Sequence, residues 1–383
     1  MTSNIVMDGE ERRRIRIYGE QRRGSFGAVS VGIRDACEAL GMLAGFVSCD
    51  VIQEHEEIGG ADAPVAIVCG APPYVAYANS LGSHERRWYM LAANSNGLPG
   101  PFVQALRNDM SQPGFLHGLL APSQWGADVL RRELPGVPVV VMPHGVSQIH
   151  HVRPQLRSQV EALYKEGRFF VVHITTTSTR RKGTAELLQA WTELYRMGSW
   201  DGAELLIMCH PAFMAPHDRM VAEARAAGAH VSLMPGLSLS SDGIASLYSQ
   251  AHVVCQPSRG EGFGMVPLES RACGVPVVAT ACTGHSEHIY PDRGVSEAVG
   301  VVVVDHGADA PIDDYPGAMA PSVSPYAITE ALLRAREEWP ALHANAMAGA
   351  PALQQSWAWP RVCEPGLSQL LADADMATEQ EEA

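Results

Sequence analysis

Two glutamates, Glu261 and Glu269, stand eight positions apart on either side of a Gly-Phe-Gly turn, in the segment PSRGEGFGMVPLESRACGVPVVATACTGHSEH (257–288). Gly262 and Gly264 tolerate positive φ and allow another molecule to approach the backbone closely. Amides that start a helix carry partial positive charge and attract anions, and carboxylates accept hydrogen bonds from hydroxyl groups. We therefore predict a site for an anionic ligand that carries several hydroxyls.

The flanking residues predict a strand, a loop, a helix and a second strand, in that order. The strands are expected at 252–256 and 275–280, where apolar and β-branched residues cluster. Pro267 suits the first helical position, and Gly274 suits a left-handed cap at the helix end. The first glutamate then lies in the loop and the second in the first helical turn, so both can point into one crevice. Taken singly, each glutamate also fits a structural role, because the helix dipole favours an acid in that turn.

A run of three cations, Arg180, Arg181 and Lys182, stands between a predicted strand at 169–174 and a predicted helix at 184–195. Fixed cations at such a turn can hold phosphate oxygens, and an arginine fork matches their geometry well. The same residues also suit a solvated helix start. The run is therefore a second candidate for binding an anion.

In the first half of the chain, a Gly-rich loop at 24–27 follows a predicted first strand at 15–18 and precedes a predicted helix at 29–40. Such a loop can bring Gly27 close to a phosphate or to a second substrate, although it equally fits a simple tight turn. His117 is the best candidate in this half for contacting a ligand, and the polar stretch after residue 92 offers Asn94 and Ser95.

Strands and helices alternate along the chain, which predicts parallel, doubly wound sheets. Further strands are expected at 43–47, 65–69, 88–92, 115–121 and 137–142 in the first half, and at 204–209, 230–234 and 299–304 in the second. A polar segment at 145–167 separates the halves. We therefore predict two Rossmann-like domains joined by this segment, with ligands at the carboxyl ends of the strands.

The composition is that of a globular protein. The chain has 383 residues, enough for two domains that each bury a core, and 46% of them are hydrophobic and 18% charged. No apolar run approaches the roughly 18 residues that cross a bilayer, and the N-terminal residues lack the apolar core of a signal peptide. The eight cysteines form no C-x-x-C pair, so we expect reduced, mostly buried thiols and a cytoplasmic protein.

Charge is unevenly distributed. The formal net charge of −14 disfavours broad attraction to nucleic acid or to an anionic membrane. Arginines nevertheless crowd the first strand and the loop after it, and the last residues, DADMATEQEEA, are acidic. We expect this acidic end to fray.

The segment that holds Glu261 and Glu269 resembles the Glu-x7-Glu signature of retaining GT-B glycosyltransferases of the nucleotide-sugar family 4, the glycosyl transferases group 1. The resemblance includes Ala-Cys-Gly-Val-Pro-Val-Val-Ala and a later His-Ser-Glu. It implies an α/β fold of the GT-B kind, in which two Rossmann-like, doubly wound domains face each other across a cleft. We expect the acceptor-side domain at 1–150 and the nucleotide-sugar domain at 168–340. A C-terminal helix at 341–372 would pack back on the first domain, before an acidic tail at 373–383.

The resemblance implies a donor site for a nucleotide-diphosphate sugar. Lys182 takes the place of the lysine that holds the diphosphate in the family motif GR-x-x-x-KG. Thr176 and Thr177 stand where the family has an arginine, so Arg180 or Arg181 would substitute for it.

Within the Glu-x7-Glu segment, the resemblance assigns Glu269 to the ribose hydroxyls and Glu261 to the transferred sugar, as a candidate catalytic residue. Backbone amides would bind sugar hydroxyls or phosphate oxygens, namely those of Phe263, Gly264 and Met265. In the first domain, Gly27 would approach the donor phosphates. His117 would contact a hydroxyl of the transferred sugar, as the second candidate catalytic residue.

The implied function is retaining transfer of a hexose from a nucleotide-diphosphate sugar, similar to UDP-glucose or GDP-mannose, to an acceptor hydroxyl. Fixed cations would neutralise the diphosphate, so we expect neither a metal ion nor a cofactor; Asp313 and Asp314 are adjacent rather than spaced as Asp-x-Asp. The acceptor is unidentified: a small molecule, a glycan or a protein is favoured, with a lipid or a modified nucleic-acid base as alternatives. A non-catalytic module that only binds nucleotide sugars is the competing hypothesis.

Overall fold

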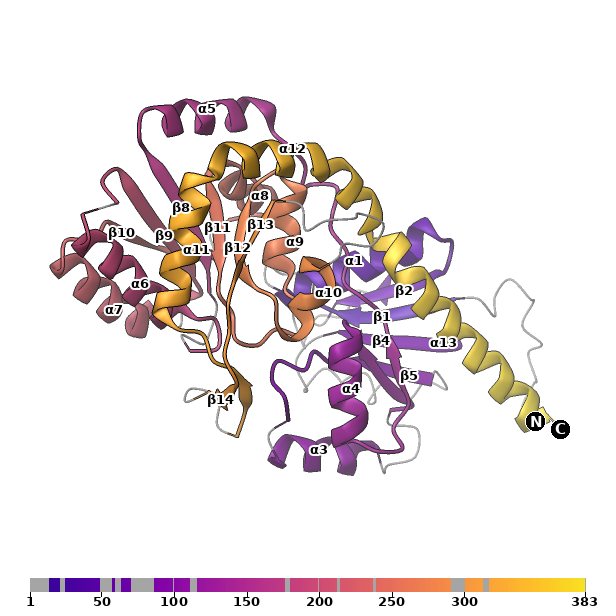
Figure 1. Cartoon of the computed structure of the whole chain (residues 1–383). Coiled ribbons are helices and arrows are strands. Elements are labelled where there is room, and N and C mark those ends of the chain that lie inside the picture. The colour runs from indigo at the N-terminus through magenta and orange to yellow at the C-terminus, as the bar shows by residue number, and fades with distance from the viewer. Residues whose placement is uncertain are drawn as a thin grey trace. The chain divides into compact units, whose positions relative to one another are not determined.

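The computed structural model of the chain describes residues 14–20, 25–48, 57–58, 63–69, 86–98, 100–110, 116–175, 180–198, 200–211, 214–236, 239–290, 300–312 and 317–382 (Figure 1). The chain divides into two compact units. Unit 1 holds Met1–Ala93, Gly100–Gly145 and Ala358–Ala383, and unit 2 holds Asn94–Pro99 and Val146–Trp357.

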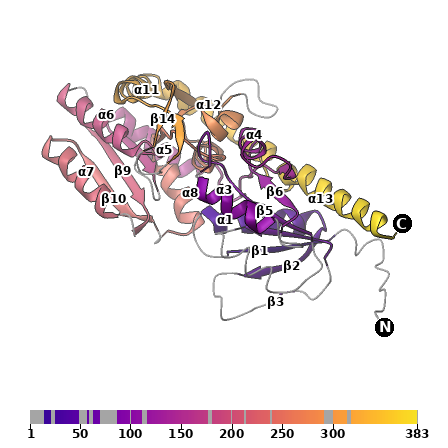
Figure 2. The same cartoon turned by 90° about the horizontal axis from the view of Figure 1, so that it is seen from below.

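Unit 1 contains a seven-stranded sheet in the order β3-β2-β1-β4-β5-β6-β7; Figure 1 labels β1, β2, β4 and β5, and Figure 2 adds β3 and β6. Its strands are β1 (Ile15–Gly19), β2 (Leu43–Ser48), β3 (Glu57–Ile58), β4 (Val65–Cys69), β5 (Arg86–Met90), β6 (Gly118–Ala121) and β7 (Val139–Val141). All neighbours pair in parallel except β2 and β3. From β3 to β6 the order is the one typical of dinucleotide-binding folds, which confirms the predicted doubly wound architecture.

Four helices belong to unit 1 in the described part of the chain: α1 (Ser25–Ala39), α3 (Gly100–Met110), α4 (Gln124–Glu133) and α13 (Trp359–Glu382). The sequence predicts the start of α4 correctly, because Ser123 Oγ accepts a hydrogen bond from Gly126 N at 3.0 Å. Helix α13 packs against α1, where the ring of Trp359 lies directly over Gly32.

Two expectations for unit 1 are wrong. Helix α1 begins at Ser25 rather than at residue 29, so Gly27 lies in its first turn instead of in a loop. The carbonyl of Gly27 accepts a hydrogen bond from Ser30 Oγ at 3.2 Å. The acidic C-terminal residues also continue α13 as far as Glu382, since Ala, Met, Gln and Glu favour helix strongly.

Unit 2 contains a six-stranded parallel sheet in the order β10-β9-β8-β11-β12-β13. Its strands are β8 (Phe169–Ile174), β9 (Ala203–Cys209), β10 (Val231–Pro235), β11 (Val253–Gln256), β12 (Val277–Thr280) and β13 (Val301–Val304). A two-stranded antiparallel hairpin joins β14 (Asp309–Pro311) and β15 (Met319–Pro321). This is again the doubly wound strand order, and each central strand lies within a few residues of its predicted range.

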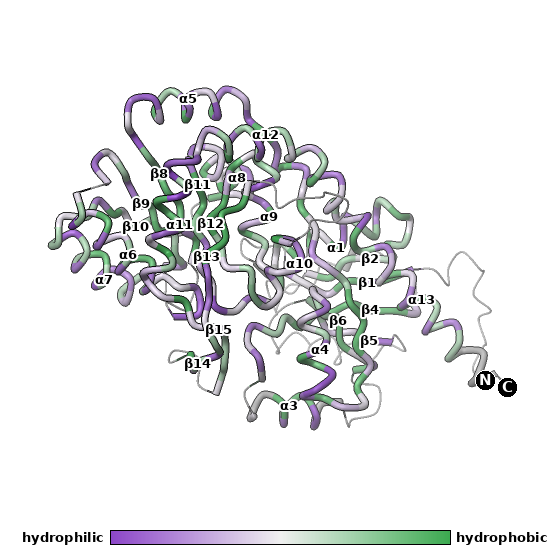
Figure 3. Tube along the Cα trace, viewed as in Figure 1, coloured by the Kyte–Doolittle hydropathy of each residue, from purple (hydrophilic) through white to green (hydrophobic). Residues whose placement is uncertain are grey.

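Side chains of successive strand residues point to opposite faces of this sheet. Val171 belongs to the core under α6 (Thr184–Arg196), α7 (Met214–Ala226) and α11 (Pro325–Glu337), whereas Val172 belongs to the core under α8 (Ser241–Gln250) and α9 (Met265–Ala272). Both cores are apolar, and the strands between them appear as hydrophobic segments in Figure 3. A strand covered on both faces needs a continuous apolar run, which is what the sequence has at these positions.

The predicted boundaries of two segments, the connection between the domains and the C-terminal helix, differ from the boundaries of the two units. The stretch expected as a polar connection, 145–167, lies in unit 2 from Val146 onward and contains helix α5 (Pro154–Lys165), which packs on α8. Its Arg-Pro step indicates a linker, but proline is well tolerated at the first helical turn. Near the C-terminus, α12 (Trp339–Ser356) lies in unit 2, so the part that returns to unit 1 begins at Ala358 rather than at residue 341.

Buried histidines make the stability of unit 2 depend on pH. Burial lowers the pKa of His285 to about 4 and that of His288 to about 3, whereas histidine in an unfolded chain titrates near 6.5. Below pH 6.5 the unfolded chain therefore binds protons that the folded chain does not. The stability contribution of each neutral, buried imidazole is complete above pH 6.5 and is lost as the pH falls toward the folded pKa.

Between pH 6.5 and pH 5, we predict that the unfolding free energy of the wild type falls by about 1–2 kcal/mol more than that of His288→Gln. Glutamine does not titrate, and its amide can still donate to the Phe263 carbonyl, which His288 Nε2 meets at 2.8 Å. Urea unfolding at several pH values measures the difference, with exposed His151→Gln as the matched control. Parallel pH curves for wild type and His288→Gln would contradict the prediction.

Candidate functional site

The strand order of unit 2 reverses between β8 and β11, which are neighbours in the middle of the sheet. In doubly wound folds, ligands bind at the carboxyl ends of the strands at this reversal. The two strand ends are tied together, because Gln256 Nε2 donates to the carbonyl of Ile174 at 3.0 Å. The loop after β8 carries Lys182, and the loop after β11 carries Glu261. The topology thus brings together the two motifs that the sequence places 79 positions apart.

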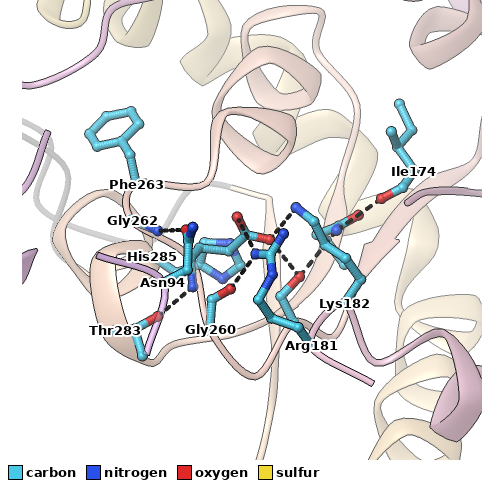
Figure 4. A network of polar contacts seen from close by, with 12 residues as sticks. Asn94, Ile174, Arg181, Lys182, Gly260, Gly262, Phe263, Thr283 and His285 are labelled. Atoms are coloured by element: carbon cyan, nitrogen blue, oxygen red, sulfur yellow. Dashed lines mark hydrogen bonds and ion pairs between the residues drawn. The ribbon is translucent and has the colours of Figure 1, made fainter. Parts of the chain in front are cut away.

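Three side chains converge on the carboxylate of Glu261. Lys182 Nζ forms an ion pair with Oε1, which also accepts a hydrogen bond from Ser258 Oγ at 2.9 Å. Arg181 Nη1 lies 3.4 Å from Oε2. Figure 4 shows the side chains of Arg181 and Lys182 pointing into this network. The side chains of both cations are 11% exposed and that of Glu261 is 9% exposed, so the group is almost completely shielded from water.

The charges of this group favour an anionic ligand. Burial alone would raise the pKa of Glu261, but the Lys182 ammonium and the Arg181 guanidinium hold it well below its ordinary value. Two cations therefore face one carboxylate. The excess positive charge lies in a desolvated position, where an added anion with several oxygens is attracted strongly.

The backbone around Arg181 and Lys182 is fixed by the loop that follows β11. Arg259 N donates to the carbonyl of Arg181 at 2.8 Å, and Arg181 Nη1 donates to the carbonyl of Gly260 at 2.7 Å. Gly183 is the N-cap residue of α6 with φ 68°, and a Cβ atom there would come within 2.1 Å of the Pro257 carbonyl oxygen. Glycine is therefore required directly after Lys182, both for the left-handed backbone and for the close approach.

The structure separates the two arginines. Arg180 Nη1 lies 3.2 Å from Glu186 Oε1, in the first turn of α6, and the Arg180 side chain is 43% exposed. Arg181, by contrast, is buried beside Glu261. Of the two candidates to replace the missing arginine, Arg181 is thus the one next to the Glu261 carboxylate. Thr176 and Thr177 lie outside the described residues.

Glu269 has different partners from Glu261. It lies in the second turn of α9 rather than in the first, because the helix begins at Met265 instead of at Pro267. Tyr248 OH donates to Glu269 Oε2 at 3.0 Å, and His150 Nε2 lies 3.8 Å from Oε1. Burial and the neighbouring carboxylate raise the pKa of Tyr248 well above its ordinary value, so the hydroxyl remains a donor. The hydrogen bond from Tyr248 thereby fixes the direction of one carboxylate oxygen of Glu269.

The Gly-Phe-Gly turn places its amides at the start of α9. Gly264 is the N-cap residue with φ 85°, as the sequence predicts for a left-handed glycine, and Met265 begins the helix. The ring of Phe263 points away from the polar network in Figure 4 and packs against His288 and Trp357, with centroid distances of 5.0 Å and 5.6 Å. Phe263 thus anchors the turn through its side chain.

The prediction for His117 is wrong. His117 lies directly before β6, at the amino end of that strand, whereas ligands of such sheets bind at the carboxyl ends. Its Nδ1 accepts a hydrogen bond from Arg87 N at 2.9 Å. Burial, followed by the charges of Arg86 and Arg87, lowers the pKa of His117 to about 4. The histidine therefore holds two neighbouring strands in register.

Two residues of the site, Ser258 and Thr283, are absent from the sequence-based assignment. Ser258 Oγ donates a hydrogen bond to the Glu261 carboxylate, and Thr283 Oγ1 accepts one from Glu261 N. Asn94, a candidate for contacting a ligand, accepts a hydrogen bond from Gly262 N through Oδ1 at 2.9 Å. Ser258 and Thr283 lie in the same 257–288 segment as Glu261, but the sequence does not show that they contact it. Asn94 comes from a distant segment, and only the folded chain brings it to Gly262.

The described residues contain neither a metal-binding cluster nor a membrane-spanning helix. Among them, no three His, Cys, Asp or Glu side chains are arranged to hold a metal ion. Asp313 and Asp314 lie outside this part of the chain. No helix within the described ranges is both long and apolar enough to cross a membrane. The seven described cysteines are buried, as predicted.

A protein-family model matches residues 168–337, from the residue before β8 to the end of α11. The family is the glycosyl transferases group 1. The group 1 match contains both Lys182 and the Glu261–Glu269 motif, so it covers the site described above.

Curated relatives match only short parts of the chain. A D-inositol 3-phosphate glycosyltransferase of Kribbella flavida is 44% identical over 78 residues, which are 20% of this chain and 16% of the relative. A protein of the same description from Corynebacterium jeikeium is 34% identical over 110 residues, or 25% of this chain and 26% of the relative. The chain thus spans about a quarter or less of the length of these relatives.

Solved structures match nearly the whole chain at low identity. A sucrose-phosphate synthase from Thermosynechococcus elongatus has a TM-score of 0.65 at 15% identity, covering 95% of this chain and 100% of its own. Anabaena HepE in complex with UDP-glucose has a TM-score of 0.65 at 14% identity, covering 94% and 99%. At this identity the likeness shows the fold, which is that of GT-B glycosyltransferases with two parallel-sheet, Rossmann-like domains.

Proposed function

We propose that this protein is a retaining glycosyltransferase that moves a hexose from a nucleotide-diphosphate sugar to an acceptor hydroxyl. The observation that carries the proposal is the buried group of Lys182, Arg181 and Glu261 at the strand reversal between β8 and β11. The group lies inside the segment that matches the glycosyl transferases group 1. An anion with hydroxyl groups is the ligand that these residues fit best.

In this proposal Lys182 and Arg181 hold the diphosphate, helped by the amides at the start of α9. Glu269, held by Tyr248, accepts hydrogen bonds from the ribose hydroxyls. Glu261 orients Lys182 and faces the transferred sugar. Because Glu261 is ionised and buried, it also stabilises positive charge near the anomeric carbon.

The reaction then proceeds on one face of the sugar. The bond between the anomeric carbon and the diphosphate oxygen breaks, and positive charge develops on the sugar ring. The departing phosphate oxygen takes the proton of the acceptor hydroxyl, whose oxygen bonds to the anomeric carbon from the same face. Lys182 and Arg181 stabilise the charge that grows on the diphosphate, so we propose that EDTA leaves the rate unchanged.

UDP-glucose is the first donor to test, because the structurally similar HepE is described in complex with it. GDP-mannose is the second, in line with the expectation from the sequence. The acceptor stays open, and inositol 3-phosphate belongs in the panel because the partial relatives are described by that activity.

A thermal-shift screen of UDP- and GDP-sugars tests the proposed function. A ligand at one hundred times its Kd stabilises a protein by about 2.7 kcal/mol, which gives a clear rise in Tm. We expect one nucleotide sugar to raise the Tm and to be hydrolysed slowly in the absence of acceptor. Binding without hydrolysis or transfer, across a broad acceptor panel, would favour the non-catalytic binding module instead. No shift with any nucleotide sugar would contradict both functions.

A further inference from the structure

Thr283 has an unusual backbone conformation. Among the described residues it is the only one other than glycine with a positive φ, at 54°. A β-branched side chain is strained in this left-handed region, and such strain persists only where the surrounding structure imposes it. Thr283 is also buried, with 6% of its surface exposed. Glycine would adopt this conformation without strain, so the threonine side chain must contribute something that glycine cannot.

The hydroxyl of Thr283 holds the backbone of Glu261. Thr283 Oγ1 accepts a hydrogen bond from Glu261 N at 3.0 Å, and Gly284 N donates to the carbonyl of Glu261 at 2.9 Å. Both backbone polar groups of Glu261 are thus held by two consecutive residues. Figure 4 shows Thr283 at the edge of the network, joined to it by this hydrogen bond.

The same turn supports the rest of the Gly-Phe-Gly loop. A Cβ atom on Gly284 would come within 2.2 Å of the Gly262 carbonyl oxygen, and one on Gly264 would come within 1.9 Å of His285 Cδ2. The turn is itself fixed, because Ser286 Oγ donates to the Thr283 carbonyl at 2.7 Å. Residues 261–264 therefore contact residues 283–285 directly, with no room for a side chain on Gly264 or Gly284.

We infer that Thr283 is a positioning residue that fixes the carboxylate of Glu261 for the transfer reaction. A glycine at this position would adopt φ 54° without strain, but it would leave the buried amide of Glu261 without its acceptor. The hydroxyl thus accounts for the strained threonine. The inference rests on the proposed function as far as turnover is concerned, but its structural part can be tested separately.

The test compares Thr283→Gly with Thr283→Ser. Glycine removes the hydroxyl and the strain together, whereas serine keeps the hydroxyl and removes only the branch. Hydrogen–deuterium exchange of residues 259–264 should become faster in Thr283→Gly and stay at the wild-type rate in Thr283→Ser. The kcat for donor hydrolysis should fall about tenfold in Thr283→Gly, because a factor of ten in rate corresponds to the net free energy of about one hydrogen bond. Its KM for the donor should stay within about twofold, because Glu269 and Lys182 still bind the nucleotide, and serine should restore kcat.

Each result bears on one claim. Unchanged exchange in Thr283→Gly would show that the hydroxyl does not hold Glu261, and would overturn the inference even if the wild type had no turnover. Faster exchange with full kcat would remove the positioning role. Equal losses in the glycine and serine variants would assign the effect to side-chain shape rather than to the hydroxyl. A wild type that hydrolyses no donor would count against the proposed function alone.

Discussion

Replacing Lys182 with alanine is expected to lower kcat/KM for the donor about 10²–10³-fold, the loss typical of removing one donor that stabilises a developing negative charge. Lys182 lies in a buried position and already forms an ion pair with Glu261, so its ammonium is preorganised for a diphosphate. The variant also leaves Glu261 with Arg181 as its one cationic partner among the described contacts, and its Tm should fall.

The chain supplies a matched control, because Lys165 is the only other lysine in the sequence. Lys165 is 69% exposed and pairs with Glu161 within helix α5. Lys165→Ala should keep the wild-type kcat/KM, since an exposed pair of this kind contributes well under 1 kcal/mol. Steady-state donor hydrolysis measures both variants. A Lys182→Ala enzyme within tenfold of the wild type would mean that the diphosphate binds elsewhere.

Glu261→Gln is expected to lower kcat about 10²–10³-fold with little change in the KM for the donor. The amide keeps the shape of the side chain but removes the charge that faces the transferred sugar. It also leaves Lys182 and Arg181 buried without their anion, which should destabilise unit 2 by about 3–5 kcal/mol.

The stability difference between the wild type and Glu261→Gln should change with pH in one direction. The pKa of Glu261 is lowered in the folded protein, so its stabilising contribution is complete above the ordinary value of about 4.3. As the pH falls through and below that value, the unfolded chain takes up a proton first, and the advantage of wild type over Glu261→Gln should shrink. An advantage that grows with acid would contradict the ion-pair assignment.

Glu269→Gln is the matched comparison for Glu261→Gln. Glu269 is held by Tyr248 and lies beside His150, away from the cations, so its loss should weaken UDP binding and raise the KM while kcat is largely kept. Calorimetric titration with UDP and steady-state kinetics separate the two effects. Small and equal effects of both substitutions would show that neither glutamate contacts the donor.

Much of the fold follows from local sequence. The apolar β-branched runs at β4, β8 and β12 predict buried strands, because a strand covered on both faces needs a continuous apolar segment. Gly264 and Gly274 are correctly predicted as left-handed positions on either side of α9. Gly264 directly precedes a helix and Gly274 follows its end, and these local settings specify the left-handed conformation without help from distant residues.

The missed features depend on distant residues. The motif around Glu261 indicates a sugar ligand but not the convergence of Lys182 and Arg181 on its carboxylate, because that convergence follows from the pairing of β8 with β11. His117 looks suitable as an isolated polar residue next to a strand. Only the parallel direction of β6 shows that it lies at the wrong end.

The most direct test of the central claim is the anomeric configuration of the first sugar released from the donor. Proton NMR can follow hydrolysis of the nucleotide sugar selected by thermal shift, before mutarotation equilibrates the anomers. A retaining enzyme that works through Lys182, Arg181 and Glu261 should release the α anomer first from an α-linked donor, and Glu261→Gln should release it far more slowly. Initial release of the β anomer, or hydrolysis that is equally fast in Glu261→Gln, would contradict the account.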